Sequence, residues 1–393
     1  MNIGLVLTGG GARASYQVGV IQAISEIYSS KEIPFKIVTG TSTGAINGAY
    51  LMSRADDFKS ATAGLWDLWK NIHTDQVYRT DPKAMAALGT RWLGTLGGFI
   101  EPRKRINHLL NTDPLRAMLN KELHLERLPN YFREGLLHGV GITATNYNTG
   151  TGVSFFDGAE ALKPWVRSTR IGIRSPITID HILASSSIPL FFPPEKINSI
   201  YYADGCIRLN SPLSPAIHLG SDRIVAIGIG HLRSESETVE VNHTPAKGKP
   251  TLAEIGGALL NSVFLDSLDT DVERMERINA TLSIISDQDR EHLPSKLRKI
   301  PILALRPSQD LGELAVGMLH EFPSIIRFLL RGLGAKENKG WDLISYLAFE
   351  KAYTNQLIQL GYKDTFDKKD TVSSFMLGSP FQTPRERLNS LIT

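Results

Sequence analysis

The chain of 393 residues contains a single cysteine, Cys206. An intramolecular disulfide is therefore excluded, and so is any zinc site built from several cysteines. The N-terminus also lacks the basic and long apolar segments of a secretory signal. Because chains without disulfides are typical of reducing compartments, we expect a cytoplasmic location.

Long apolar runs and a large excess of one charge are lacking as well. No apolar stretch reaches the ~20 residues that a membrane-spanning helix needs, so the sequence predicts a soluble chain. Lysine and arginine together number 43 and the acidic residues 40, which gives a formal net charge of +3. So small an excess does not indicate a nucleic-acid partner. Peripheral contact with anionic lipid is left open.

What the sequence does contain is a repeated unit of strand, glycine turn and helix. Its parts are residues 3–7, 9–11 and 14–27 in the first copy, and 35–38, 40–44 and 45–52 in the second. Later apolar runs predict further strands at 140–145, 224–229 and 300–305. Pro301 cannot donate to a strand ladder, so the last run belongs at a sheet edge or begins after the proline. The alternation favours an α/β fold with a mostly parallel sheet.

The pattern changes along the chain and predicts three parts. Strands and helices alternate over residues 1–235, the part of the chain that contains the motifs described below. Residues 236–310 continue this α/β body, and the polar stretch 234–250, which carries glycine and proline, is predicted to be a mobile loop at its start. Residues 311–393 show helix patterns without strands and predict a helical extension packed on the body.

The segment from Gly40 to Gly44 has the pattern of a nucleophile elbow, with Ser42 at its centre. In such an elbow a serine sits on a tight turn between a strand and a helix, and the residues two positions away must be small. The turn projects the hydroxyl at a helix N-terminus, where unpaired N–H groups and the helix dipole favour developing negative charge. The preceding apolar run and the following helix pattern supply this context, so Ser42 is a candidate nucleophile.

Three successive glycines, Gly9, Gly10 and Gly11, follow the first predicted strand. Without side chains their N–H groups can approach a ligand, as an oxyanion hole requires, and one such donor contributes on the order of 3 kcal/mol in a transition state. Arg13 either orients this loop or adds positive charge. A tight structural connection is the plainer alternative. The loop also fits a dinucleotide-binding fingerprint, but the acidic residue which that motif needs after the second strand is absent.

A serine nucleophile needs a base, and Asp204, followed by Gly205 and Cys206, ends a short apolar run. Taken alone, Asp-Gly is more often an ordinary turn. Together, however, the glycine loop with Arg13, the Ser42 elbow and the Asp-Gly pair resemble the patatin-like phospholipases in order and context. Further stretches that resemble this family lie at 142–150, 184–194 and 208–213.

The resemblance implies a three-layer sandwich and a Ser42–Asp204 dyad without histidine. Asp204 would accept the Ser42 proton, the glycine loop would hold the oxyanion, and fatty-acyl esters of phospholipids or related lipids would be hydrolysed. No cofactor is implied. The chain departs from the family at Ala14, usually glycine, and at Cys206, usually glycine or alanine. The Cys206 thiol beside Asp204 predicts sensitivity to oxidation or alkylation.

Two alternatives stay open. His231 follows the run 224–229 and would complete the order Ser, Asp, His of the α/β-hydrolases, although in that fold the nucleophile follows several strands rather than the second. We expect both His231 and His181 to be solvent-exposed, and no pattern indicates a metal site. The other alternative is a non-catalytic lipid-binding or scaffolding protein, against which the intact Ser42, Asp204 and glycine loop argue.

Two apolar segments outside the predicted strands are candidates for contact with a lipid surface. Residues 85–100 gather leucine, tryptophan and phenylalanine among glycines. Residues 322–333 interleave apolar side chains with Arg327 and Arg331, as in a basic amphipathic helix at a membrane interface. Packing against the sheet explains either segment equally well. The expected partner is a lipid or acyl-ester substrate.

Overall fold

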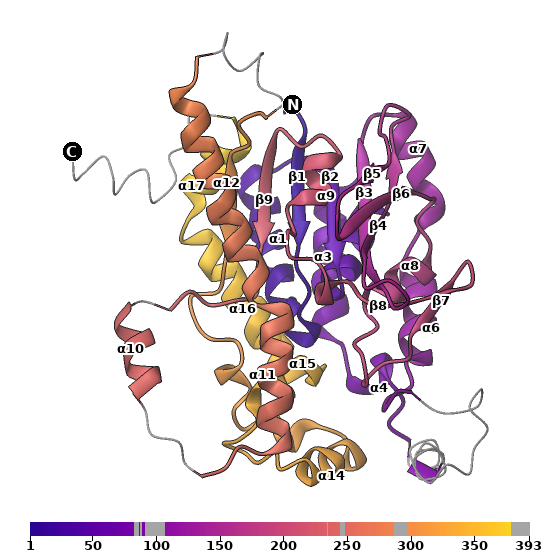
Figure 1. Cartoon of the computed structure of the whole chain (residues 1–393), viewed down its shortest axis with the longest axis vertical. Coiled ribbons are helices and arrows are strands. Elements are labelled where there is room, and N and C mark those ends of the chain that lie inside the picture. The colour runs from indigo at the N-terminus through magenta and orange to yellow at the C-terminus, as the bar shows by residue number, and fades with distance from the viewer. Residues whose placement is uncertain are drawn as a thin grey trace.

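The computed structural model describes residues 1–81, 86, 89–90, 107–233, 235–243, 248–286 and 297–378. Figure 1 shows a central sheet flanked by helices, with helices of the C-terminal third along one side of the sheet and at its lower end. The predicted α/β fold with a mostly parallel central sheet and a helical C-terminal region is confirmed.

One sheet contains the strands of the described residues, in the order β10-β9-β1-β2-β3-β4-β6-β5, with β8 paired to β3 and β7 to β8. The strands are β1 (Ile3–Leu7), β2 (Phe35–Thr41), β3 (Gly139–Asn146), β4 (Gly152–Gly158), β5 (Trp165–Val166), β6 (Arg170–Arg174), β7 (Glu195–Ile197), β8 (Ile200–Asp204), β9 (Arg223–Ile227) and β10 (Ile302–Leu305). The run from β10 to β3 is parallel throughout. The carboxyl ends of parallel strands lie at a common edge of the sheet, and the candidate active site described below lies at this edge.

Successive side chains of the parallel strands enter two different cores, because side chains alternate between the faces of a sheet. In β1, Leu5 and Leu7 pack into the larger core, whereas Val6 packs into the smaller one. In β9, Val225 and Ile224 divide in the same way. Burial on both faces explains why these strands are unbroken apolar runs in the sequence.

Helices cover both faces of the sheet. The larger core is covered by α1 (Ser15–Tyr28), α2 (Thr43–Met52), α3 (Phe58–Lys70) and α16 (Lys351–Phe366), and the smaller by α9 (Ser214–His218) and α12 (Asp266–Ile284). The remaining described helices are η1 (Gly11–Ala14), α4 (Thr74–Val77), α6 (Asp113–Glu122), η3 (Leu125–Arg127), α7 (Leu128–Arg133), α8 (Ile179–Ser185), η4 (Gly205–Ile207), α10 (Glu235–His243), α11 (Leu252–Phe264), η5 (Glu313–Ala315), η6 (Met318–Glu321), α14 (Ser324–Gly332), α15 (Trp341–Leu347) and α17 (Lys369–Met376).

The predicted strands are confirmed as β1, β2, β3, β9 and β10. Strand β10 begins after Pro301 and lies at the edge of the sheet, as the missing N–H of proline requires. Strands β4 to β7 are not predicted from the sequence, and of these β5 and β7 are too brief to show a period.

The predicted helical C-terminal region is confirmed, and its helices pack directly on the α/β body. Helix α16 lies along α1, and glycines let the two backbones approach closely. A Cβ at Gly19 would lie 1.9 Å from the Ile358 carbonyl oxygen, and one at Gly361 would lie 2.1 Å from the Tyr16 carbonyl oxygen. Larger side chains at these two positions would therefore separate the helices.

The predicted loop over 234–250 is wrong in its first half, where helix α10 covers Glu235–His243. Glu237 lies in the first turn of this helix, where a negative charge interacts favourably with the helix dipole. Residues 234 and 244–247 lie outside the described residues.

Across the described ranges, no helix combines the length and the apolar character needed to cross a bilayer. The apolar segment 85–100 lies outside the described residues, apart from residues 86, 89 and 90.

Candidate active site

The strand register brings Ser42 and Asp204 together. Strands β2 and β3 run parallel, and their pairing ends with Thr41 opposite Thr143. From the next residue of β3 onward, β8 pairs antiparallel with it, beginning with Asp204 opposite Ala144. Because β4 already pairs with one side of β3 at this point, β8 must pair with the side where β2 ends. The last residue of β8 therefore meets the first residue after β2.

Ser42 occupies the turn between β2 and α2 in a strained conformation. Its φ of 54° and ψ of −130° lie outside the favoured regions for a residue with a side chain, and such strain costs on the order of 1–3 kcal/mol. A Cβ at Gly40 would lie 2.5 Å from the Gly44 carbonyl oxygen, and one at Gly44 would lie 2.4 Å from that of Leu7. Both glycines are needed because the turn is tight, as the elbow pattern predicts.

The end of α8 holds both candidate residues in place. The Ser42 N–H donates to Ser185 Oγ at 2.8 Å, and the Ser185 hydroxyl donates to the Thr143 carbonyl at 2.6 Å. The Asp204 N–H donates to the Ser187 carbonyl at 2.9 Å. This role of Ser185 is not predicted from the sequence. The only signal for it is that the small-residue run of 184–187 is among the stretches that resemble the family.

Asp204 is a buried carboxyl with one oxygen uncommitted. Burial raises its pKa to about 6, while the Ser42 hydroxyl and the N–H and thiol of Cys206 limit the rise. Oδ1 accepts the Cys206 N–H at 2.9 Å. Oδ2 has no partner at full hydrogen-bond geometry among the described residues, so the contact with Ser42 is a loose one. A carboxylate of this pKa is ionised at neutral pH and more basic than free aspartate.

The glycine loop lies directly against Ser42. A Cβ at Gly9 would lie 2.6 Å from the Ser42 Cβ and 2.5 Å from the Cys206 Sγ. Gly11 has a φ of 54°, in the left-handed region, and a Cβ there would meet the Tyr346 carbonyl oxygen at 2.2 Å. Only glycine fits at these two positions.

The N–H groups of this loop differ in what they face. Burial and Asp204 raise the pKa of the Cys206 thiol. The Gly9 N–H lies against this thiol and lowers its pKa by a smaller amount. No acceptor in the described part of the chain takes the N–H of Gly10 or Gly11. These two groups precede or open the short helix η1, where N–H groups have no partner within the helix. They are therefore available to a ligand.

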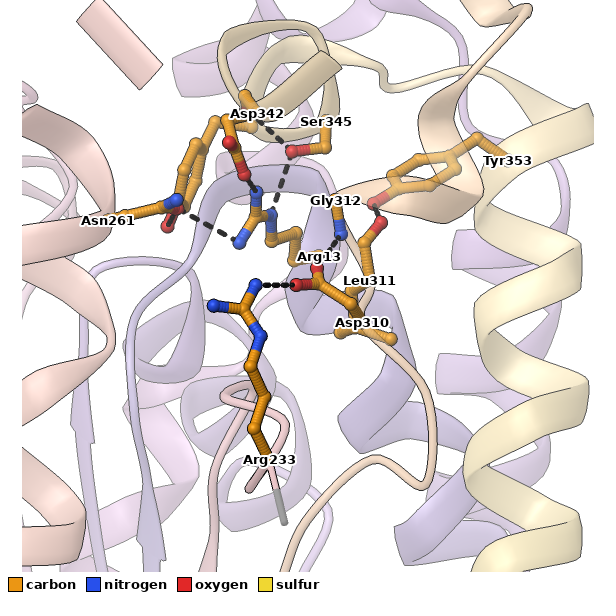
Figure 2. Close-up of polar contacts among 10 residues, drawn as sticks. Arg13, Arg233, Asn261, Asp310, Leu311, Gly312, Asp342, Ser345 and Tyr353 are labelled. Carbon is orange, nitrogen blue, oxygen red and sulfur yellow. Dashed lines mark hydrogen bonds and ion pairs between the residues drawn. The ribbon is translucent and has the colours of Figure 1, made fainter. Parts of the chain in front are cut away.

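Arg13 reaches away from the loop into helices α11 and α15 (Figure 2). Its Nε donates to Ser345 Oγ at 2.8 Å and its Nη2 to Asp342 Oδ1 at 2.8 Å. Its Nη1 donates to Asn261 Oδ1 at 3.2 Å, and the guanidinium lies 4.1 Å from the centre of the Tyr346 ring. Because the side chain is buried and each of its three nitrogens donates a hydrogen bond, the contacts favour orientation of the loop over added charge at the nucleophile.

A chain of buried polar side chains connects the same loop to α2 and α3. Gln17 Nε2 donates to the Thr8 carbonyl at 2.7 Å, and Asn47 Nδ2 donates to Gln17 Oε1 at 3.0 Å. Trp69 Nε1 donates to Asn47 Oδ1 at 2.8 Å. No sequence pattern marks these residues. Because a buried amide must find hydrogen-bond partners, this chain of contacts stiffens the loop and the helices around it.

Ser42 lines a narrow cavity whose other walls are mostly apolar. Elements α2, α3, α4 and α6 contribute to it, with side chains such as Ile46, Trp69, Met118 and Phe349. The cavity measures about 20 Å³, which is room for about one water molecule. An acyl chain would therefore enter only if side chains move, and the unbranched Met118 is suited to do so.

Cys206 is half-buried beside Asp204. Burial and the neighbouring carboxylate raise the pKa of its thiol well above the usual value. The thiol therefore stays protonated at neutral pH, which argues against the sensitivity to alkylation that the sequence predicts.

The prediction that His181 is solvent-exposed is wrong. It is buried, its Nδ1 bonds to Thr178 at the start of α8, and its ring packs on Phe155 at 4.3 Å between centres. His231 is partly buried, and its ring contacts the Pro307 carbonyl at 3.1 Å rather than Ser42 or Asp204. Its described contacts therefore give no support to a Ser-Asp-His triad.

No three histidine, cysteine, aspartate or glutamate side chains of the described residues come together as a metal site would require.

A serine on an elbow between strand and helix, with free N–H groups and a carboxyl beside it, is the arrangement of an α/β acyl hydrolase. The comparison of sequences narrows this class. The model of the family described as Patatin-like phospholipase matches residues 5–217, more than half of the chain, and the chain belongs to this family.

Curated relatives match short segments. The lysophospholipase nte1 of Aspergillus terreus is 53% identical over 55 residues, which are 14% of this chain and 3% of that protein. The patatin-like phospholipase domain-containing protein ZK370.4 of Caenorhabditis elegans is 40% identical over 76 residues, 18% of this chain and 5% of that protein. The matched segments thus span a small part of the length of these relatives.

Solved structures are similar at low identity. Human GIVD cytosolic phospholipase A2, in complex with a fluorophosphonate inhibitor, aligns with 96% of this chain and 59% of its own, with a TM-score of 0.46 and 13% identity. VipD from Legionella pneumophila aligns with 94% of this chain and 67% of its own, with a TM-score of 0.37 and 13% identity.

Proposed function

We propose that this protein is a serine acyl hydrolase that cleaves fatty-acyl ester bonds of phospholipids or related lipids, with Ser42 as nucleophile and Asp204 as general base. The observation that carries the proposal is the strand register: β8 pairs with β3 on the side where β2 ends, and Asp204 therefore lies beside Ser42. Membership of the patatin-like phospholipase family supports a lipid ester as substrate.

In this mechanism Asp204 accepts the Ser42 proton while Oγ attacks the ester carbonyl. The protonated Asp204 then gives the proton to the departing alcohol, which leaves an acyl group on Ser42. Water attacks the acyl-serine, Asp204 takes its proton, and the fatty acid is released as the proton returns to Ser42. Proton transfer requires the Ser42 hydroxyl and Asp204 Oδ2 to come within hydrogen-bonding distance, and we expect their loose contact to shorten when substrate binds.

The N–H groups of Gly10 and Gly11 act as the oxyanion donors, because they have no other acceptor among the described residues. Gly9 serves a different purpose, since only a residue without a side chain allows the loop to lie against Ser42 and Cys206. Arg13 keeps the loop in place, and Gly205 lets the base motif turn, because a Cβ there would lie 2.1 Å from the Thr143 carbonyl oxygen.

The apolar cavity receives the acyl chain, and the alcohol portion of the substrate stays outside it. The proposed place of action is the cytoplasmic side of a membrane, where the protein works as a peripheral enzyme on lipid that the bilayer presents.

The test is release of fatty acid from phospholipid vesicles by the wild type and by Ser42→Ala, with a soluble short-chain ester as second substrate. Both activities should fall by on the order of 10³-fold or more in the variant. Covalent labelling by a fluorophosphonate should disappear with them. Labelling that persists on another serine overturns the assignment of Ser42.

The two substrates separate the remaining outcomes. Turnover of the soluble ester alone would retain an acyl hydrolase but contradict a phospholipid substrate. If the folded wild type turns over neither substrate, the lipid-binding or scaffolding alternative would be favoured.

A further inference from the structure

Helix α11 is apolar on both of its faces. Leu260 and Phe264 are buried against the body of the protein. Leu252, Ile255 and Leu259 are 64%, 45% and 64% exposed, and their spacing of three and four residues places them on one outer face. Single exposed leucines are ordinary, but an apolar row along a helix is not.

Helix α14 also exposes apolar side chains. Phe328 and Leu329 are 71% and 42% exposed. The two helices adjoin, because the Ala253 N–H at the start of α11 donates to the Leu333 carbonyl just after α14, at 2.9 Å. Figure 1 shows both helices in the lower half of the molecule. The apolar platform is defined here as Leu252, Ile255, Leu259, Phe328 and Leu329.

Positive charge accompanies the platform. Helix α14 contains Arg327 and Arg331 and no acidic residue. The one acidic residue of α11, Glu254, is held in the cap of its first turn. Two exposed acidic residues flank α14: Glu321 before it contacts His320 at 3.0 Å, and Glu337 beyond it follows the exposed Lys336. Exposed apolar side chains beside arginines match a surface that combines acyl chains with anionic headgroups.

A second copy of this chain is a poorer fit for the same surface. A symmetric dimer places the same patch of both subunits face to face. Both copies would then bring the arginines of α14 into one interface, and like charges at an interface oppose association. The charge of α14 thus favours an anionic lipid surface over self-association.

The C-terminal end of α11 lies at the glycine loop. A Cβ at Gly9 would be 3.1 Å from the Phe264 ring, and Asn261 accepts a hydrogen bond from Arg13. With a rise of 1.5 Å per residue, Leu259 and Leu252 lie roughly 8 and 18 Å along the helix from Phe264. A lipid surface on the platform would therefore lie close to the loop beside Ser42.

We propose that the apolar platform docks on an anionic phospholipid surface and thereby brings the candidate active site to its substrate. This inference rests on the proposed function, since it names the surface on which that activity takes place. Insertion of the exposed side chains transfers apolar area out of water, and the arginines contact the headgroups.

The experiment measures binding to vesicles of phosphatidylcholine with phosphatidylglycerol by co-sedimentation. The variant Ile255→Ser/Leu259→Ser should bind at least tenfold more weakly than wild type, because each replacement removes a large inserted side chain. The matched control is Val166→Ser in β5, an apolar residue that is 74% exposed outside the platform, and it should bind like wild type. Thermal unfolding checks that both variants are folded.

Activity adds a second readout. The ratio of vesicle turnover to soluble-ester turnover should fall at least tenfold in Ile255→Ser/Leu259→Ser and stay constant in Val166→Ser. Unchanged vesicle binding by the platform variant overturns the proposal. So does a wild-type dimer in the absence of lipid that becomes monomeric in this variant.

The docking proposal and the proposed function fail separately. Ser42→Ala should bind vesicles as wild type does even though its turnover is lost. If wild type binds through the platform but hydrolyses neither substrate, the function is wrong and the docking surface stands.

Discussion

At the scale of the residue, Asp204 combines a chemical use with a cost in stability. Its folded pKa of about 6 lies above that of free aspartate, about 3.9. A raised pKa means that the folded protein binds this proton more tightly than the unfolded chain does. This contribution to the free energy of unfolding is present below pH ~4 and is lost as the pH rises through about 6. The loss at neutral pH is on the order of 3 kcal/mol.

The variant Asp204→Asn should therefore lose nearly all activity and yet unfold at a higher temperature than wild type at pH 7.5. Asparagine removes the base and the buried charge together. Turnover of a soluble ester and thermal unfolding are measured side by side. The companion variant His231→Ala should keep its activity, and the opposite pattern, an inactive His231→Ala beside an active Asp204→Asn, would restore the triad.

The pH dependence of the reaction should report the same carboxyl. Asp204 acts as a base only when ionised, so kcat/KM for a soluble ester should rise with pH up to an apparent pKa of about 6 and then level off. The Cys206 thiol lowers this pKa, so Cys206→Ala should move the acid limb to higher pH. Cys206→Ser keeps a donor and is the control. An acid limb near pH 4 would contradict the raised pKa of Asp204, and an acid limb that Cys206→Ala leaves in place would contradict Asp204 as the group that titrates.

At the scale of the element, the glycine loop depends on helices that come much later in the chain. The contacts of Arg13 with Asn261, Asp342 and Ser345 join residues 248, 329 and 332 positions apart (Figure 2). Gly312 packs on the same guanidinium, since a Cβ there would lie 2.8 Å from Arg13 Nη2. The helical extension is in this way part of the site rather than a separate appendage.

Arg13→Lys should lower kcat by roughly 10- to 100-fold with a smaller change in KM. Lysine keeps the charge but lacks the planar fork, so the loop loses anchors while substrate binding remains. The control is Arg233→Gln, which breaks the neighbouring pair with Asp310 at 3.0 Å. Those two side chains are 45% and 25% exposed, and such pairs contribute about 0–1 kcal/mol. An unchanged kcat in Arg13→Lys would show that the loop does not need this anchor.

At the scale of the whole molecule, the buried His181 should make the free energy of unfolding fall in acid. Burial lowers the pKa of His181 to about 4, below its usual 6.5. Between these two values the unfolded chain binds a proton that the folded protein does not, so stability is present above pH 6.5 and is lost as the pH falls towards 4.

The matched variant is His181→Asn, which can still bond to Thr178. From pH 7 to pH 5, wild type should lose about 2 kcal/mol of unfolding free energy relative to this variant. Urea unfolding at both pH values measures the difference. A difference that does not change with pH would contradict a neutral, buried His181.

Much of the fold could be predicted because its signals are local. The parallel strands appear as apolar runs, and the elbow around Ser42 and the glycine loop appear as short patterns. Asp204 was different, since Asp-Gly is an ordinary turn until other motifs give it context. Ser185, Asn47 and the partners of Arg13 showed no local pattern. The boundaries at 235 and 310 stay predictions.

The sequence by itself determined where the chain could form strands, helices and tight turns. Periodicity and the need for glycine at a crowded turn act among near neighbours, so they can be recognised without the fold. Only the tertiary structure decided the register that joins Asp204 to Ser42, the pKa of that carboxyl, the outer face that α11 leaves exposed and the anchors of Arg13. Each of these depends on burial and on contacts between residues far apart in the chain, which exist only once the elements have packed.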